Sequence, residues 1–294
     1  MATGETTGET TGEALPSAAA APYLFHRHAL AVRVTHWINA LAIVFLIGTG
    51  FNIFNAHAGL YWGEYGADND DSKRWLEIGS ADTPQGVAYG FLRIGSLTVR
   101  TTGVLGISTG ANGQLQAIAY PAWSTIPSGR DLATARNFHF FFAWVLIING
   151  LVYLGYSLAT GHLRKDLLPR LKELRPANIV HDIVQHAKLK FPKGEEAKHY
   201  HILQKLAYGG VVLVVIPLVI LTGLGMSPGT NAAWPWLLDV FGGRQSSRSL
   251  HWIASNLIIL FIIVHLAMVV LAGPFNEMRS MITGKFRVDP KVTK

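Results

Sequence analysis

Four stretches of the sequence are apolar over more than twenty residues and carry almost no charge. They span residues 32–54, 137–158, 206–226 and 250–272. A helix needs about 20 residues to cross the hydrocarbon core of a bilayer, and in lipid every backbone polar group must be satisfied within the protein. The sequence therefore predicts an all-α membrane protein built as a bundle of four transmembrane helices. Pro217 lies inside the third stretch, where we expect a tolerated kink.

Composition excludes several kinds of redox centre and partner. The chain contains no cysteine, so it has neither disulfides nor thiolate-bound iron-sulfur clusters, and it cannot attach a c-type haem covalently. The formal net charge is +7, but the basic residues flank the apolar stretches and do not alternate with aromatic residues. This distribution favours a membrane surface over nucleic acid.

The N-terminal 22 residues contain a Thr-Gly-Glu repeat and almost nothing that could be buried. They lack the basic start and the apolar run of a signal peptide, since no base precedes Arg27. We expect residues 1–22 to be a disordered cytoplasmic tail, 23–287 to form one membrane domain, and 288–294 to be a short C-terminal tail.

Basic residues predict the orientation of the helices. They are concentrated in the connection 159–200 and after the fourth stretch, whereas the turn between the third and fourth stretches contains only Arg244 and Arg248. Cytoplasmic segments carry the excess of Lys and Arg. Both termini are therefore expected on the cytoplasmic side of the inner membrane, and residues 56–133 on the outer side.

Two connections are expected to have structure of their own. Residues 56–133, hereafter the outer segment, are too long for a simple loop, and the Thr, Val and Gly content of residues 91–108 predicts a hairpin. The outer segment also carries a group of acidic residues: Asp68, Asp70, Asp71, Glu77 and Asp82. On the cytoplasmic side, residues 178–191 predict an amphipathic helix that lies on the membrane.

Four histidines lie inside or at the ends of the apolar stretches: His36, His139, His251 and His265. His251 and His265 are fourteen residues apart in one helix, which brings the second within about 40° of the first and ~21 Å further along the axis. Because successive helices alternate in direction, His139 is level with His251 on the outer side, and His36 with His265 on the inner side. The sequence predicts two pairs.

Neutral imidazole is a good axial ligand for haem iron, and a helix bundle can hold a planar cofactor between facing side chains. Two histidine ligands leave no open iron position, which favours electron transfer. Zinc fits less well, because no carboxylate or thiol accompanies either pair. A single histidine could instead make an interhelical hydrogen bond, and His57 could compete with His139 as a ligand.

An arginine precedes three of these histidines by three residues, which places Arg33, Arg136 and Arg248 on the same helix face as the histidine that follows. Each could bind a haem propionate, or could be an ordinary interfacial arginine. Glycines in the apolar stretches would let a ring approach the backbone, although small residues also serve helix contacts. They are Gly48, Gly50, Gly150, Gly223 and Gly225.

Several segments together resemble a known family. They read "RVTHWINALAIVFLIGTG", "NAHAGLYWG", "ARNFHFFFAWVLIINGLVYL", "LQKLAYGG", "LTGLGMSPG", "LLDVFGGRQSSRSLHWIA" and "AGPFNEMRSMITGK". They resemble prokaryotic cytochrome b561-type membrane subunits of the thiosulfate reductase cytochrome b kind, which are similar to the cytochrome b subunits of formate dehydrogenases and nickel-iron hydrogenases. The resemblance covers residues 23–287. It implies two haem b groups, an outer one on His139 and His251 and an inner one on His36 and His265.

The resemblance also implies a quinone site before the third helix, beside the inner haem. Gln204 and Lys205 match the relatives, whereas His201 and Leu203 stand where formate dehydrogenase subunits have Asn and Gly. His199 also lies at this depth. We expect His201 to contact the quinone headgroup; the alternative is a solvated residue at the helix entrance.

These observations favour a dihaem cytochrome that carries electrons between the quinone pool and an extracytoplasmic catalytic subunit. The resemblance implies a partner of the molybdopterin or hydrogenase type, often reached through an iron-sulfur subunit, and the outer segment is the expected docking surface. Two alternatives stay open: a stand-alone quinone or superoxide oxidoreductase, and a haemless transporter. The sequence has no phosphate-binding loop or hydrolytic triad that would indicate catalysis by this chain alone.

Overall fold

The computed structural model describes residues 21–66, 73–188 and 200–289. Four sets of residues discussed above lie outside these ranges: the repeat-containing residues 1–20, the aspartates Asp68, Asp70 and Asp71, His199, and residues 290–294.

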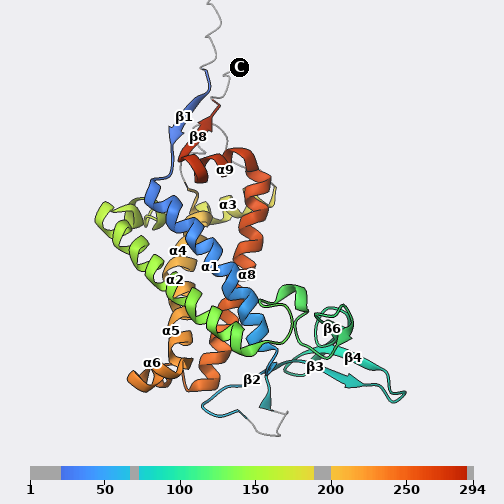
Figure 1. Ribbon diagram of the computed structural model, residues 1–294. Coiled ribbons are helices and arrows are strands. Elements are labelled where there is room, and N and C mark those ends of the chain that lie inside the picture. The colour runs from blue at the N-terminus through green and yellow to red at the C-terminus, as the bar shows by residue number, and fades with distance from the viewer. Residues whose placement is uncertain (1–20, 67–72, 189–199, 290–294) are drawn as a thin grey trace, which may run out of the picture.

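Four long helices dominate the structure, and each is long and apolar enough to cross a membrane. They are α1 (Leu30–Phe54), α2 (Leu132–Thr160), the continuous run of α4 (Ile202–Gly210), η5 (Val211–Val215) and α5 (Ile216–Met226), and α8 (Arg244–Ala272). Figure 1 shows them crossing the middle of the molecule, with smaller elements gathered at its two ends. The prediction of four such helices is confirmed.

The helices extend beyond the apolar stretches that predicted them. Helix α2 begins five residues before the apolar run, because Asp131 accepts a hydrogen bond of 3.0 Å from the N–H of Thr134 and so caps the helix. It ends at Gly161, whose φ of +73° is the left-handed conformation typical of a glycine after a helix. Hydropathy detects only the part of a helix that lies in lipid, and the polar first turns are missed.

The third long helix contains a π-helical turn, Val211–Val215, just before Pro217. Proline has no N–H, and its ring clashes with the carbonyl four residues earlier in a regular α-helix. In a regular α-helix, the N–H of residue 217 would donate a hydrogen bond to the carbonyl of residue 213. The wider π-helical turn includes residue 213, whose carbonyl cannot receive this bond from a proline. The irregularity expected at Pro217 is thus a single π turn inside an otherwise helical span.

The outer segment contains β-sheet, so the expectation of an all-α chain is wrong for this part. Strands β2 (Gly59–Leu60), β3 (Leu76–Asp82), β4 (Ala88–Ile94) and β5 (Leu97–Arg100) form one antiparallel sheet, and β6 (Ser108–Thr109) pairs with β7 (Leu115–Gln116). The hairpin predicted within residues 91–108 is confirmed: β4 and β5 turn at Gly95, with Ile94 opposite Leu97. Short strands of mixed polarity give little hydropathy signal, which is why β2 and β3 were not predicted.

A small core joins this sheet to the outer end of α1. Phe54 at the end of α1 packs with Leu60, Leu76 and Ile78 from the strands and with Tyr120, which follows the second sheet. Short helices cover the same end of the molecule: η2 (Ala122–Ser124), α6 (Pro228–Ala233) and α7 (Trp236–Val240). The outer segment is therefore packed on the helix bundle.

The opposite end is closed by strands from the two ends of the chain. Strand β1 (Tyr23–His26) pairs with β8 (Lys285–Val288) beyond α9 (Pro274–Thr283), as Figure 1 shows. Arg27 forms an ion pair of 3.1 Å with Glu277 of α9. The helix predicted over residues 178–191 is confirmed as far as Ala187, in α3 (Pro176–Ala187), which follows the π-helical turn η3 (Leu163–Leu167), and residues 189–191 of the prediction lie outside the described residues. Its placement on a membrane stays a prediction.

Polar groups bind α1 to α2 inside the bundle. The side-chain amide of Asn149 is 7% exposed and donates to the carbonyl oxygen of Thr35 at 2.8 Å and to the side-chain oxygen of Asn39 at 2.6 Å. Hydrogen bonds between membrane helices stabilise their association modestly, by about 0.6 kcal/mol on average. Asn149 therefore fixes how α1 and α2 are paired.

We expect Asn149→Ala to lower the free energy of unfolding in detergent by roughly 1 kcal/mol, because both interhelical bonds are lost. Asn256→Ala is the matched control, since the Asn256 amide donates only to the carbonyl of Trp252 within its own helix. Thermal unfolding followed by circular dichroism measures both variants. Equal stabilities for the two would contradict an interhelical role for Asn149.

Candidate functional site

The structure brings the four histidines together as two pairs, and α8 contributes one member of each. The rings of His139 on α2 and His251 on α8 have centroids 6.2 Å apart, with their planes at 58°. The rings of His36 on α1 and His265 on α8 have centroids 6.5 Å apart, with their planes at 59°. The members of each pair are those expected to share a depth in the membrane.

Both separations suit a metal ion between two imidazoles. A bond from a metal to an imidazole nitrogen is about 2 Å long and that nitrogen lies about 1 Å from the ring centroid, so two coordinating rings have centroids about 6 Å apart. In the described part of the chain, no group of three or more His, Asp or Glu could hold a metal ion. Two nitrogens without further ligands are what a haem iron requires of a protein.

Each histidine of the outer pair is held by a threonine from a neighbouring helix. Thr49 Oγ1 on α1 lies 2.9 Å from His139 Nδ1, and Thr222 Oγ1 on α5 lies 3.1 Å from His251 Nδ1. Both threonines are fully buried. Our sequence reasoning did not identify them, although each is the first residue of a Thr-Gly dipeptide in an apolar stretch.

The glycine after each threonine lies against the same ring. A Cβ on Gly223 would be 3.1 Å from His251 Cε1, and one on Gly50 would be 3.7 Å from His139 Cε1. Gly223 thus provides space that a side chain would take from the ring. The other predicted glycines do not contact these imidazoles: Gly48 faces Ile126, Gly225 faces Leu238 and Gly150 is open.

The inner pair lies among aromatic rings. His265 stacks on Phe261 at 5.6 Å, and Tyr208 approaches it edge-on at 6.2 Å. The edge of Trp37 contacts His36 at 5.2 Å. His36 Nδ1 is buried and has no hydrogen-bond partner within the described ranges. The environments of the inner and outer pairs therefore differ in polarity.

The three predicted arginines have different partners. Arg33 donates to the carbonyl of Ile282 in α9, and Arg248 donates to the carbonyls of His57 and Gly59 in the outer segment. Arg136 is exposed and lies over the ring of Phe140 at 5.8 Å. Arg33 and Arg248 thus connect helices to neighbouring segments, and Arg136 is the most accessible of the three for an anionic group.

The outer segment holds the start of α8, close to His251. The carbonyl of Gly63 accepts hydrogen bonds from the N–H groups of Gln245 and Ser246 at 3.0 and 3.1 Å, which satisfies two amides of the first turn. Ser249 donates to the carbonyl of Tyr61 at 2.6 Å. His57, the alternative to His139, is exposed and its ring stacks on Tyr61. The ring next to His251 is that of His139.

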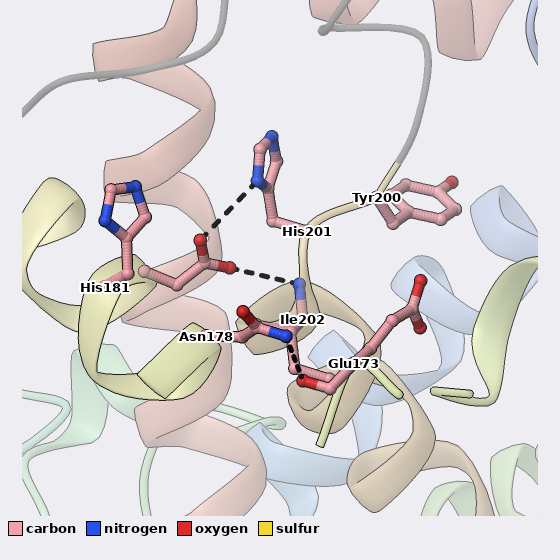
Figure 2. Close-up of a pocket in the computed structure, with 7 residues that line it drawn as sticks. Glu173, Asn178, His181, Tyr200, His201 and Ile202 are labelled. Carbon is pink, nitrogen blue, oxygen red and sulfur yellow. Dashed lines mark hydrogen bonds and ion pairs between the residues drawn. The ribbon is translucent and has the colours of Figure 1, made fainter. Parts of the chain in front are cut away.

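A pocket of about 270 Å³ lies where α3 meets the start of α4. It is lined by Glu173, Asn178, His181, Asp182, Tyr200, His201 and Ile202 (Figure 2). The Asp182 carboxylate accepts a bond of 3.1 Å from the N–H of Ile202, and its other oxygen is 3.8 Å from His201 Nδ1. His201 Nε2 is buried and has no hydrogen-bond partner among the residues that the structure describes.

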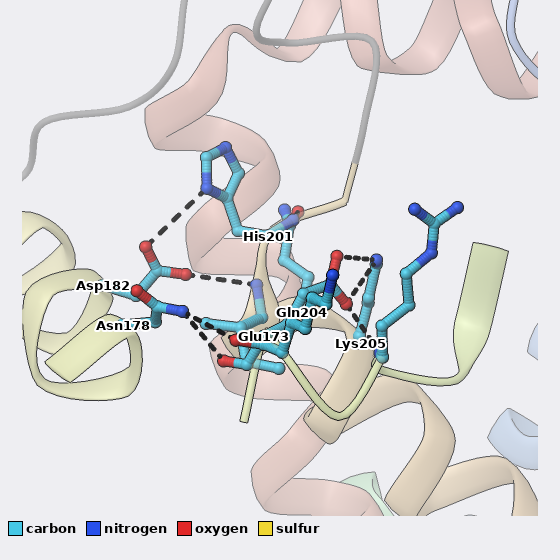
Figure 3. A network of polar contacts seen from close by, with 9 residues as sticks. Glu173, Asn178, Asp182, His201, Gln204 and Lys205 are labelled. Atoms are coloured by element: carbon cyan, nitrogen blue, oxygen red, sulfur yellow. Dashed lines mark hydrogen bonds and ion pairs between the residues drawn. The ribbon is translucent and has the colours of Figure 1, made fainter. Parts of the chain in front are cut away.

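Gln204 and Lys205 hold the first turn of α4 in place (Figure 3). The side-chain oxygen of Gln204 accepts from the N–H of His201 at 3.1 Å. Lys205 is 8% exposed and donates to both carboxylate oxygens of Glu173, at 2.8 and 2.9 Å. The hydrogen bond from Lys205 holds the pKa of Glu173 below its usual value. Three residues were predicted to bind quinone. Of these, His201 has a buried side-chain nitrogen, Nε2, that has no hydrogen-bond partner in the described chain and could bind a ligand.

Two aromatic rings connect this pocket to the inner pair. Tyr200 lines the pocket, and its ring lies 5.5 Å from that of Tyr208, which in turn contacts His265. Burial raises the pKa of Tyr200 above its usual value, so this phenol is neutral at physiological pH. The pocket is therefore two ring contacts away from an inner-pair histidine.

The family model for prokaryotic cytochrome b561 matches residues 27–284. A relative from Azospira oryzae, provisionally named as the protein-methionine-sulfoxide reductase subunit YedZ1, is 32% identical over 146 residues, which are 50% of this chain and 70% of the relative. No solved structure matches this chain significantly.

Proposed function

Because this chain belongs to the prokaryotic cytochrome b561 family, we propose that it is a dihaem b-type cytochrome of the membrane. His139 and His251 would hold an outer haem b, and His36 and His265 an inner one. Haem iron supplies one-electron chemistry when bound. The observation that carries the proposal is the pair of imidazole separations, 6.2 and 6.5 Å, at two levels of α8.

The chain's own residues explain why electron transfer is favoured over reaction at the iron. Each pair offers two imidazoles close together, and an iron held by both would have no position open for oxygen or another substrate. Fourteen residues separate His251 from His265, a rise of ~21 Å along α8, so one haem cannot use both. The two histidine pairs, at two depths of α8, would let one subunit carry electrons across most of the bilayer.

Histidine substitution tests the ligand assignment. We expect His251→Ala to lose the outer haem and His265→Ala the inner one, each variant keeping about half of the bound haem, because the two sites share no ligand. The haem-to-protein ratio of purified protein measures this. His139→Ala is expected to lose the outer haem as His251→Ala does. His57→Ala is its control and should keep both haems, since His57 stacks on Tyr61 outside the pair. An unchanged ratio in both α8 variants would contradict ligation by this helix.

The proposed orientation has both termini in the cytoplasm and the outer segment outside the inner membrane. The connection from α2 to α4 and the region of α9 and β8 carry the basic excess. The strand pair β1–β8 and the sheets of the outer segment lie at opposite ends of the bundle (Figure 1), so the two are expected on opposite sides of the membrane.

Topology reporters test this orientation. A reporter fused after Lys294 is expected to be active only in its cytoplasmic form, and one inserted at the exposed Gly86 turn between β3 and β4 only in its extracytoplasmic form. Cell fractionation with both reporter types provides the measurement. An extracytoplasmic C-terminus would overturn the assignment of inner and outer haems.

An extracytoplasmic redox subunit is the proposed partner at the outer segment. Large apolar side chains are exposed there, among them Tyr65 at 79%, Leu97 at 63% and Trp123 at 81%. Exposed apolar side chains in a water-facing region are typical of an interaction surface. The name of the Azospira oryzae relative describes a reductase subunit, which agrees with a cytochrome that works in a larger enzyme. A molybdopterin or hydrogenase subunit, directly or through an iron-sulfur subunit, fits this role.

Quinone is the proposed electron partner on the inner side, with its headgroup in the pocket beside His201. A cavity of about 150 Å³ already admits benzene, so about 270 Å³ accommodates a substituted ring. His201 Nε2 is a buried hydrogen-bonding group without a partner in the described chain. Quinone chemistry couples electrons to protons, and an imidazole nitrogen can donate or accept a hydrogen bond to the headgroup. Gln204 and Lys205 shape the site by fixing the start of α4.

Replacement of His201 tests this location. We expect His201→Ala to slow quinone-dependent haem oxidation or reduction severalfold while haem content and spectrum stay unchanged, because the headgroup loses its hydrogen-bond partner. Stopped-flow absorbance at the haem bands gives the rate. His181→Ala is the matched control, since His181 lines the same pocket and is exposed. Parent-like turnover and inhibitor sensitivity in His201→Ala would move the site elsewhere, and the outer pair would become the better candidate.

A further inference from the structure

We propose that Thr49 and Thr222 are positioning residues that fix the orientation and the tautomer of the two outer haem ligands. This inference rests on the proposed function and extends it to residues that do not contact the iron themselves. Each threonine lies within hydrogen-bond distance of one outer histidine, at 2.9 Å from His139 Nδ1 and 3.1 Å from His251 Nδ1.

The direction of these hydrogen bonds follows from the threonine hydroxyls. A hydroxyl has one proton to donate and can accept two bonds. Thr49 donates its proton to the carbonyl of Phe45 at 2.6 Å, and Thr222 donates to the carbonyl of Leu218 at 2.7 Å. The oxygen atoms are then acceptors toward the rings. Nδ1 of each histidine therefore carries the proton and donates it to threonine.

This tautomer leaves the ligating lone pair on the other ring nitrogen. A neutral imidazole protonated at Nδ1 has its free lone pair at Nε2, which is the atom available to a metal. Metal-ligating histidines almost always donate their second ring N–H to a fixed acceptor. Because Thr49 and Thr222 are fully buried, water does not compete for the bond and the ring orientation is fixed.

The same arrangement occurs twice, on two separate helix pairs. In each, a Thr-Gly dipeptide on the earlier helix contacts a histidine near the start of the later one: Thr49-Gly50 against His139 on α2, and Thr222-Gly223 against His251 on α8. The threonine supplies the acceptor, and at His251 the glycine also leaves room for the ring, since a Cβ on Gly223 would be 3.1 Å from His251 Cε1. Because the contact is made to both histidines of one pair, we interpret it as a specific feature of this site. The inner His36 has no such acceptor among the described residues.

The test replaces each hydroxyl with a methyl group of the same shape. In Thr49→Val and Thr222→Val we expect the midpoint potential and the low-spin electron paramagnetic resonance signal of the outer haem to shift, while those of the inner haem stay at parent values. Release of the outer haem to an excess of a haem-binding acceptor protein should accelerate by about tenfold. Thr49→Ser and Thr222→Ser keep the hydroxyl and are expected to restore parent behaviour.

Thr35→Val is the matched control. Thr35 is 4% exposed and donates to the carbonyl of Ala31 at 2.8 Å in the same local pattern, without a hydrogen bond to any histidine. It therefore reports the cost of losing a buried hydroxyl from α1. Unchanged outer-haem potential, resonance signal and release in both Val variants, with two haems bound, would overturn this inference and leave the dihaem proposal intact. Fewer than two haems in the parent protein would overturn both.

Discussion

Helix α8 carries one member of each histidine pair, and the arrangement of the other long helices depends on that fact. Burying an imidazole in lipid is unfavourable unless another group satisfies it, so each histidine of α8 needs a neighbouring helix at its own depth. Helix α2 meets α8 at His251, and α1 meets it at His265. Helix α5 packs along α8 through Val219, and its threonine reaches the outer pair. A membrane bundle has little hydrophobic driving force between helices, and these polar contacts specify which helices become neighbours.

The outer segment and the outer histidine pair form one connected structure. Backbone carbonyls of His57, Gly59, Tyr61 and Gly63 accept hydrogen bonds from the first turns of α8, which lead directly into His251. A subunit that docks on this segment would therefore rest on the element that holds the start of α8, close to the proposed outer ligand His251.

The sequence predicted well how far along each helix axis a residue lies. It predicted poorly which face of a helix points at which neighbour. Apolar length placed four helices, and alternating direction then matched His139 with His251, because position along an axis follows from residue number. Which face of α1 or α5 points at which histidine depends on packing between helices, so Thr49 and Thr222 could not be assigned. Arg33 and Arg248 show the same limit: their depth was right for an anionic group, yet their guanidinium groups bind backbone carbonyls. The sheet of the outer segment was missed except for the hairpin, since its short strands rely on partners distant in sequence.

Both histidine pairs take one member from the last long helix of the chain, and this imposes an order on biosynthesis. Ribosomes release α1 and α2 first, with His36 and His139 already in the membrane and no opposite imidazole to face. Neither pair exists until α8 has been inserted, and β8 follows α8 and α9 before it can pair with β1. Cofactor loading at the two proposed sites would therefore have to follow the insertion of α8. A polypeptide truncated before α8 contains two of the four histidines and neither of the sites.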